Sequence, residues 1–448
     1  MRSSIFFIAS LICLAPLAIN AADEWPDFRG PDGQGHSDAK GLPVTWSESQ
    51  NVVWKTPIPG RGWSSPVISG DEIWMTTAVE AEKPDAQTPP STDDYKSPKP
   101  GPGTKVSPKP ISLRALCASL KSGKIIKNIE IFFIEKPGNI HDRNSYASPS
   151  PVIEGERLYV HFGTYGTACV STREPKVRWR NKDMKLEHEN GPGGSAVLYK
   201  DKLLICCDGM DAQYMAALNK KTGEFAWKTP RSIVIKKADN MKKAYGTPLV
   251  VAIDGKDQVV TPAAEGVYSY DPATGKELWR VKYPGFSNVA RPVYDGKLLY
   301  VSTGFMKPEM WAIKPEGSGE LAADKVIWRE KIQAALQSSP ALSGNRLYMV
   351  SDSGVVRCLE AATGKEFWRQ KLATDAAASP LIADGKVYLL DPREGATVVE
   401  DSETFKQLAK NTLDDGFMAS PAVAGKALIL RTKQSLYRIE TPAGGPPQ

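Results

Sequence analysis

Short apolar strands separated by turns recur along this chain and predict a repeated antiparallel β-sheet. Three segments carry a Thr-Gly turn followed, four residues after the glycine, by a tryptophan: Lys221–Trp227, Ala273–Trp279 and Ala362–Trp368. Repeats of about 20–50 residues indicate a solenoid, a propeller or an array, because each unit buries its apolar face on its neighbours.

Eight segments open alike, with small residues or a proline leading into an apolar strand. They are Ser65–Val67, Ser150–Val152, Gly194–Val197, Thr247–Leu249, Arg291–Val293, Ser339–Ala341, Ser379–Leu381 and Ser420–Ala422. Most continue through an Asp-Gly or Glu-Gly turn, as in Asp295–Tyr300, which is a strong hairpin signal. A third strand and the tryptophan strand complete each unit. Four-stranded units repeated radially form a propeller, so the sequence predicts an all-β, eight-bladed antiparallel β-propeller.

The two ends of the repeat complement each other. The last unit, Phe417–Ile439, has no tryptophan strand after it, whereas Val52–Lys55 is a tryptophan strand without a unit of its own. We expect the N-terminal strand to close the last blade, which removes the edges that an open ring would expose. The propeller then spans residues 51–440, followed by a flexible tail at 441–448.

Two segments fall outside the repeat. Residues 79–110 of the first blade are rich in Pro, Lys, Ser and Asp and predict a disordered insertion. Residues 22–50 contain Gly30, Gly33 and Gly35 without a strand before them, which favours a turn-rich N-terminal arm over a phosphate-binding loop.

Composition narrows the class of protein. Hydrophobic residues make up 41% and charged residues 24%, typical of a soluble globular protein. The net charge of +6 is spread along the chain, so no nucleic-acid partner is expected.

The first residues predict export. Arg2, the apolar run Ile5–Ala18 and the small residues at 20–22 are typical of a signal peptide over residues 1–21, cleaved after Ala21. The apolar run is shorter than the roughly 20 residues of a membrane span, and no transmembrane segment is expected elsewhere. The expected location is periplasmic or secreted.

The repeat resembles the pyrroloquinoline-quinone-type repeat of quinoprotein-like eight-bladed propellers. The Thr-Gly-x-x-x-Trp segments and the Ser-Pro openings carry this resemblance over nearly all of the chain after Val52. A narrower resemblance, to exported planctomycete-type propeller proteins of unsettled activity, is carried by the segments Phe28–Pro31, Asn144–Pro149, Tyr159–Gly163 and Cys207–Gly209. Fold does not define function, which depends on the residues of the site.

Cys206-Cys207-Asp208 is the sharpest local motif. In quinone-dependent alcohol dehydrogenases with this repeat, a comparable Cys-Cys-Asp forms a disulfide between neighbouring residues against the cofactor, so the resemblance implies a vicinal disulfide here. The match ends at Gly209, where those enzymes carry Asn-Arg-Gly. The favoured alternative is that the strand places one cysteine, as a small apolar side chain, between two blades.

A quinone cofactor would also require calcium, which takes six or more oxygen ligands. No segment shows a run of such ligands and no haem-attachment motif is present, so pyrroloquinoline quinone with calcium is not favoured and no cofactor is assigned. No His or Cys spacing typical of a metal site is present either.

Three of the four histidines fall near the second and third blades. His141 and His188 precede inner strands, where loops reach the mouth of the central channel, and a convergent polar mouth is a ligand-site candidate. The full candidate set is His141, Asn144, Tyr146, His161, His188, Asp208 and Asp211. The alternative is that these residues make local loop hydrogen bonds.

Three functions remain open. The first is an exported, non-catalytic binding or scaffolding propeller, which takes an unknown protein or small-molecule ligand through its channel mouth or one face. The second is a quinone-dependent dehydrogenase of alcohols or sugars. The third is an outer-membrane assembly propeller, against which the missing lipid-attachment cysteine argues.

Overall fold

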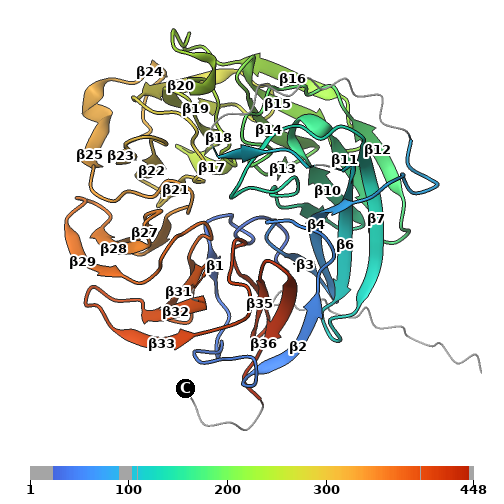
Figure 1. Cartoon of the computed structure of the whole chain (residues 1–448). Coiled ribbons are helices and arrows are strands. Elements are labelled where there is room, and N and C mark those ends of the chain that lie inside the picture. The colour runs from blue at the N-terminus through green and yellow to red at the C-terminus, as the bar shows by residue number, and fades with distance from the viewer. Residues whose placement is uncertain (1–23, 90–102, 108, 394, 443–448) are drawn as a thin grey trace, which may run out of the picture.

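The computed structural model describes residues 24–89, 103–107, 109–393 and 395–442. These residues form eight four-stranded antiparallel blades around a central channel (Figure 1). The described helical structure is limited to 3-10 turns such as Gly163–Tyr165 and Asp239–Met241. The prediction of an all-β, eight-bladed antiparallel propeller is therefore confirmed.

Each blade runs from an inner strand at the channel to an outer strand at the rim. Blade 1 contains β3 Val67–Ser69, β4 Glu72–Glu80, β6 Ile111–Ser119 and β7 Ile125–Ile134, and blade 2 contains β9 Val152–Glu154, β10 Arg157–His161, β11 Thr167–Ser171 and β12 Val177–Asn181. Blade 3 contains β13 Val197–Tyr199, β14 Lys202–Asp208, β15 Gln213–Asn219 and β16 Phe225–Pro230, and blade 4 contains β17 Leu249–Ile253, β18 Lys256–Ala263, β19 Gly266–Tyr270 and β20 Glu277–Lys282. Blade 5 contains β21 Val293–Tyr294, β22 Leu299–Ser302, β23 Met310–Ile313 and β25 Val326–Glu330, and blade 6 contains β26 Ala341–Ser343, β27 Arg346–Val350, β28 Val355–Glu360 and β29 Glu366–Lys371. Blade 7 contains β30 Leu381–Ala383, β31 Lys386–Asp391, β32 Gly395–Glu400 and β33 Gln407–Asn411, and blade 8 contains β34 Ala422–Ala424, β35 Ala427–Arg431, β36 Ser435–Ile439 and β2 Val52–Pro57.

The ring closes between the two ends of the propeller. Strand β2 pairs antiparallel with β36, with Trp54 opposite Arg438, and forms the outer strand of blade 8 (Figure 1). The N-terminal strand therefore joins the C-terminal blade, as its tryptophan predicted. No blade needs an additional chain to complete its four strands.

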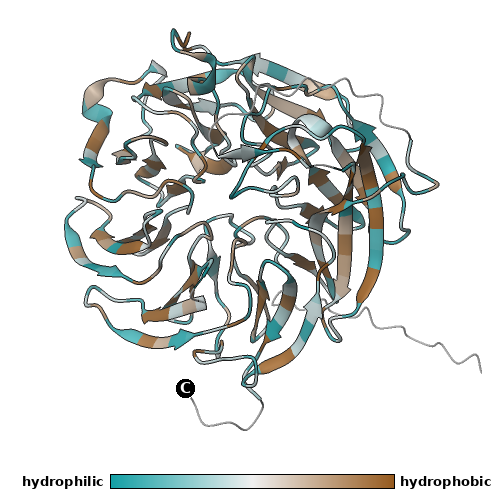
Figure 2. Ribbon diagram, in the orientation of Figure 1, coloured by the Kyte–Doolittle hydropathy of each residue, from teal (hydrophilic) through white to brown (hydrophobic). Residues whose placement is uncertain are grey.

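Burial follows position within the blade. The second and third strands, such as β10, are buried on both faces because neighbouring blades cover them. Outer strands such as β2 alternate between half-buried and exposed positions, because one of their faces meets solvent. Figure 2 shows the same division, with brown concentrated in the middle strands and teal more frequent on the outer strands and rim loops.

In most blades a tryptophan on the outer strand joins the blade to the next one. In five blades its indole N–H donates to a backbone carbonyl of the following blade's turn: Trp54 to Leu120 (3.0 Å), Trp179 to Lys220 (3.2 Å), Trp227 to Pro272 (3.2 Å), Trp328 to Ala361 (2.9 Å) and Trp368 to Ser402 (3.0 Å). The turn glycine is required by this contact. A Cβ on Gly275, whose φ is +75°, would lie 2.6 Å from the Trp227 ring.

Trp279 departs from this rule. Its indole N–H donates to Gln258 Oε1 at 2.8 Å, within its own blade. The following blade has no Thr-Gly turn there; instead β24, Gly319–Glu320, pairs in parallel with β20 beside Trp279. The added strand covers the junction that a turn covers elsewhere.

The N-terminal arm crosses the end of the channel opposite the mouth. Trp25 pairs with Ile68 of blade 1, and the Pro26 carbonyl accepts from the backbone N–H of Ile153 in blade 2 at 2.9 Å. Strand β1, His36–Ser37, then adds in parallel to β30 of blade 7 (Figure 1). The arm is thus anchored on several inner strands, and its glycines serve close packing: Gly33, at φ +67°, lies against Arg291.

Parts of three predicted segments lie outside the described residues. These are the signal peptide at 1–21, residues 90–102 and 108 of the insertion at 79–110, and residues 443–448 of the tail. Within the insertion, Val79 and Glu80 belong to β4, and β5, Thr104–Lys105, pairs with β8, Ile140–His141. The ordered part of the insertion therefore reaches the loop that carries His141.

Candidate ligand site at the channel mouth

A cavity of about 620 Å³ lies at the mouth of the central channel. Its walls are mainly the loops that precede the inner strands, together with loops between the second and third strands, such as the one carrying Asp352. Pockets of roughly 300–1,000 Å³ hold small-molecule ligands in proteins. The cavity is therefore large enough for a ligand of metabolite size.

A ring of hydroxyl side chains encircles the cavity. Its members, here called the hydroxyl ring, are Ser65, Ser150, Ser195, Thr247, Ser339, Ser379 and Ser420. The backbone N–H of one blade's opening residue donates to the hydroxyl of the next at 2.8–3.0 Å, and the Ser420-to-Ser65 bond carries the ring across the closure. The small residues that open the inner strands therefore have a structural role.

Arg291 takes the eighth position of the ring. Its backbone N–H donates to the Ser339 hydroxyl at 3.0 Å, but its own side chain turns toward the arm. There the guanidinium donates to the Phe28 carbonyl at 2.7 Å and lies 3.4 Å from the Asp27 carboxylate. Phe28 itself lines the cavity, and the arm thus contributes to the cavity wall.

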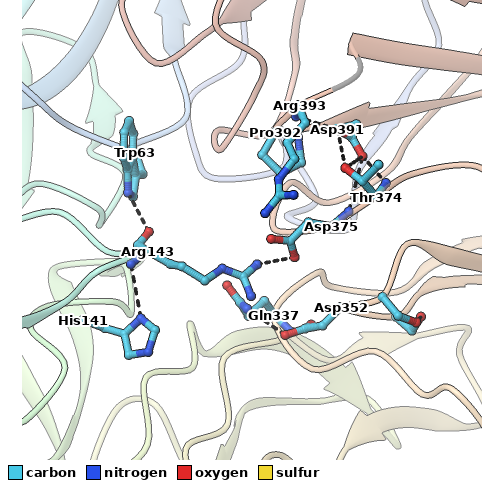
Figure 3. A network of polar contacts seen from close by, with 12 residues as sticks. Trp63, His141, Arg143, Gln337, Asp352, Thr374, Asp375, Asp391, Pro392 and Arg393 are labelled. Carbon is cyan, nitrogen blue, oxygen red and sulfur yellow. Dashed lines mark hydrogen bonds and ion pairs between the residues drawn. The ribbon is translucent and has the colours of Figure 1, made fainter. Parts of the chain in front are cut away.

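A charged bridge spans part of the mouth. Arg143, from the loop before β9, lies 2.5 Å from Asp375, from the loop before β30 on the opposite side of the ring (Figure 3). The Trp63 indole N–H donates to the Arg143 carbonyl at 2.9 Å, and the Arg143 N–H donates to His141 Nδ1 at 3.2 Å. These bonds fix the backbone from which the guanidinium extends.

Asp352 lies beside this bridge. Among the described residues, its carboxylate accepts hydrogen bonds from two neutral donors, the side-chain and backbone amides of Gln337. The Gln337 side-chain amide donates at 2.7 Å and its backbone N–H at 3.2 Å (Figure 3). Burial raises the pKa of Asp352 above its usual range. Lys243 and Glu189 form a second ion pair in the lining.

The remaining lining includes a group of large apolar side chains. Phe286 and Phe305 meet edge to face with ring centroids 5.8 Å apart, and Met306 follows Phe305 at the rim. Phe305 is 49% exposed and Met306 68% exposed. We call Phe286, Phe305 and Met306 the apolar lip. The mouth therefore combines paired charges with an exposed apolar surface.

Two of the seven predicted site residues line this cavity, His141 and Asn144. Burial, together with the nearby Arg143, lowers the pKa of His141, which keeps its ring neutral at pH 7. The Asn144 amide donates to the carbonyls of Asn190 and Pro192 at 2.7 and 3.0 Å, so it also orders the loop. Tyr146 lies behind them and donates to the Gly138 carbonyl at 2.7 Å.

His161 and His188 lie beneath the surface and do not line the cavity. His161 is 6% exposed, and its Nδ1 lies 2.7 Å from the Thr167 hydroxyl. His188 is 7% exposed and packs against Tyr245. Burial lowers the pKa of His161 to about 3 and that of His188 to about 4. Both act as neutral packing residues.

Asp208 and Asp211 also have local partners. Asp208 is 1% exposed and accepts two bonds from Arg231, at 2.7 and 2.9 Å, in a buried bidentate ion pair. Asp211 accepts from the backbone N–H of Glu187 at 2.9 Å. Neither carboxylate lines the cavity.

Cys206 and Cys207 are free thiols in the structure and form no vicinal disulfide. Strand alternation explains this: the Cys206 sulfur lies 2.8 Å from the Thr261 hydroxyl of blade 4, whereas the Cys207 sulfur lies 3.8 Å from Met184 on the other face of β14. The structure therefore agrees with the alternative that cysteine fills space between blades.

Two further observations bound the chemistry. Among the described residues, no group of three or more His, Cys, Asp or Glu side chains is placed to hold a metal ion. The part of the chain that the structure covers also contains no helix long and apolar enough to cross a membrane.

The sequence did not point to most of the charged and aromatic residues of the site. Trp63, Arg143 and Lys243 line the cavity and Asp375 pairs with Arg143, and each of the four stands two to seven residues before an opening of the repeat. That position was the available signal, because every such loop ends at the channel. The prediction started from the histidines and included Asn144 and Tyr146 of the loop that carries His141, but none of these four residues.

Comparisons with known proteins found one family model and several similar solved structures. A family model described as "Outer membrane protein assembly factor BamB" matches residues 211–322 and 317–404. Quinohemoprotein alcohol dehydrogenase from Comamonas testosteroni has a crystal structure similar over 96% of this chain and 83% of its own, with a TM-score of 0.62 and 10% identity. BamB from Moraxella catarrhalis is similar over 78% and 98%, with a TM-score of 0.49 and 13% identity.

A europium-containing methanol dehydrogenase is similar at a TM-score of 0.43 and 10% identity, over 85% of this chain and 89% of its own. No curated protein matches the sequence. The family model matches less than half of the chain, so it supports a repeat of the pyrroloquinoline-quinone type over residues 211–404. At these identities the structural likeness concerns the fold alone.

Proposed function

We propose that this protein is an exported ligand-binding propeller whose channel mouth holds a small molecule. The observation that carries the proposal is the cavity of about 620 Å³, lined by loops from around the ring, by the hydroxyl ring and by Phe28. Such a cavity has the size of a ligand pocket, with a few convergent polar groups. The charged side chains there are engaged with one another or with amides, which suits binding more than turnover.

A cavity-filling variant tests this function. Ala377 lines the cavity with a small side chain, so Ala377→Trp should place an indole ring in the cavity and obstruct it, whereas Lys365→Trp changes an exposed residue of a rim turn. Thermal-shift screening of a metabolite library against the intact protein should find a stabilising compound. We expect Ala377→Trp to abolish that shift and Lys365→Trp to keep it. A shift that survives Ala377→Trp, or turnover of an alcohol or sugar by the purified protein alone, would contradict the proposal.

The quinone-dependent dehydrogenase is the second candidate, but the residues present do not fit its cofactor. Cys206 and Cys207 point to opposite faces of β14, and neither lines the cavity. Two carboxylates near the mouth are paired with cations, Glu189 with Lys243 and Asp375 with Arg143, which leaves Asp352, held by the Gln337 amide. Calcium takes several hard oxygen ligands, and among the described residues no group of three or more His, Cys, Asp or Glu side chains is placed to hold a metal ion. Titration with pyrroloquinoline quinone and calcium, followed by absorbance, decides: saturable binding would restore this candidate.

Outer-membrane assembly is the third candidate, supported by the name of the family model that matches residues 211–404. A propeller of that function would present a face to partner proteins rather than a cavity to a small molecule. A pull-down from the native host, with tagged protein as bait, tests this. Recovery of barrel-assembly proteins would favour it over the small-molecule site.

Export is part of the proposal and rests on the leader at residues 1–21. N-terminal sequencing of the mature protein should begin at Ala22, immediately after the expected cleavage site. A mature chain that begins at Met1 would contradict export through this signal. The narrower kinship with exported planctomycete-type propellers likewise stays a proposal, carried by the motifs that include Phe28–Pro31.

A further inference from the structure

The charged side chains at the mouth differ in whether their partners carry the opposite charge. Arg143 is engaged by Asp375, and Lys243 by Glu189. Asp352, in contrast, lines the cavity with amide partners only. A carboxylate held by neutral donors keeps acceptor capacity for a charged group, and a bond between opposite charges is about twice as strong as a neutral one.

The apolar lip lies in the same cavity as Asp352. Its exposed Phe305 and Met306 form an apolar surface at the rim, and large exposed apolar residues beside a cavity mark binding sites. The face of an aromatic ring also attracts a cation, because the ring quadrupole is negative there. The Asp352 carboxylate and the aromatic rings of the apolar lip therefore both favour a positively charged ligand group.

We propose that the channel mouth recognises an organic amine, whose ammonium group binds Asp352 and whose apolar body packs against Phe286, Phe305 and Met306. This inference rests on the proposed ligand-binding function and specifies the chemistry of the ligand. The site is distinct from the histidine-centred set suggested by the sequence. An anionic ligand is disfavoured, because it would have to displace Asp375 from Arg143 or Glu189 from Lys243.

The surroundings of Asp352 set the pH dependence. Arg143 and Asp375 are the charged groups that act on its carboxyl: the first lowers its pKa and the second raises it, while burial is the largest influence and raises it. A protonated Asp352 offers no negative charge. Amine binding should consequently strengthen as pH rises through the pKa of Asp352, which burial holds above its usual range, because the carboxyl then ionises while the amine keeps its proton.

Three probes of nearly equal size test the class: phenethylamine, phenethyl alcohol and phenylacetate, titrated calorimetrically into the intact protein at neutral pH. We expect the amine to bind at least about tenfold more tightly than the other two, a difference of about 1.4 kcal/mol. Asp352→Asn keeps the shape of the side chain and should erase that preference and its pH dependence. Asp324→Asn, a change of an exposed aspartate remote from the mouth, is the matched control.

Two results would overturn the inference: equal or weaker affinity for the amine, or an amine preference that survives Asp352→Asn. Phe305→Ala separates the two parts of the site, since it should weaken the amine and the alcohol alike. The Ala377→Trp variant separates this inference from the function beneath it. If the amine fails while another compound binds in a manner lost in Ala377→Trp, the binding function stands and the amine assignment falls.

Discussion

Truncation of Trp54 tests the closure of the ring, on which the position of every site loop depends. This residue belongs to β2 and so lies about 380 residues before Arg438, its partner in β36. Its indole packs on the turn glycine Gly123 of blade 1, and its N–H donates to Leu120 at 3.0 Å. Trp54→Ala therefore loosens both the closing strand and the junction between blades 8 and 1.

The expected cost follows from burial and the hydrogen bond. A fully buried tryptophan truncated to alanine loses about 3–5 kcal/mol, and the half-buried Trp54 should lose about 2–3 kcal/mol. Loss of the hydrogen bond adds about 1 kcal/mol. Unfolding entropy near 60 °C is about 2.1 cal/mol/K per residue, so a propeller of roughly 390 residues gives about 0.8 kcal/mol/K. The melting temperature should fall by about 4–5 °C.

Circular dichroism melting measures this shift, with Val53→Ala as the control. Val53 neighbours Trp54 on the same strand but is 52% exposed, so its change should cost less than about 0.5 kcal/mol. Trp54→Phe should fall between the two, because it keeps ring packing and loses the N–H. If Trp54→Ala melts within a degree of Val53→Ala, β2 does not stabilise the closed ring.

Three further predictions concern buried groups. Asp208→Asn leaves the buried Arg231 without its carboxylate and should cost about 3–5 kcal/mol, which Arg231→Met in the same chain should partly restore; denaturant unfolding checks both. His161 and His188 stay neutral in the fold while the unfolded chain binds their protons below pH 6.5, so stability should fall on acidification from pH 7 to 5 by up to about 1.4 kcal/mol per pH unit for each. His161→Gln should remove the contribution of His161 to this pH dependence, which thermal unfolding at several pH values measures. Burial raises the pKa of the half-buried Cys206 to about 11, so a thiol reagent should label it slowly at pH 8 in the native protein and rapidly after unfolding; rapid native labelling would contradict the raised pKa.

Much of the fold was predictable because a propeller repeats its signals. A tryptophan strand at Trp54 without a blade, and a last blade without a tryptophan strand, left one economical solution. The Thr-Gly turns were equally informative, since a turn glycine such as Gly275 packs against the tryptophan of the preceding blade. Where the signal failed, at Trp279, the chain supplies β24 instead of a turn, and no local pattern announces that a two-residue strand will pair in parallel.

The sequence indicated where on the propeller the candidate site lies, but it did not indicate most of the residues that line it. Loops before inner strands reach the channel, and this rule correctly directed attention to His141. The same rule applied to His188, yet its ring turned sideways onto Tyr245. Whether a loop side chain enters the channel or packs between blades depends on neighbouring loops from distant sequence.

The sequence by itself determined the number of blades and the closing strand, because these depend on periodicity and on side chains that the blades repeat. Only the tertiary structure decided what meets at the channel. Arg143 and Asp375 lie 232 positions apart, and Phe28 of the arm lines a cavity whose walls come from all around the ring. Such contacts arise once, between single residues brought together by ring closure, and a contact made once leaves no period in the sequence.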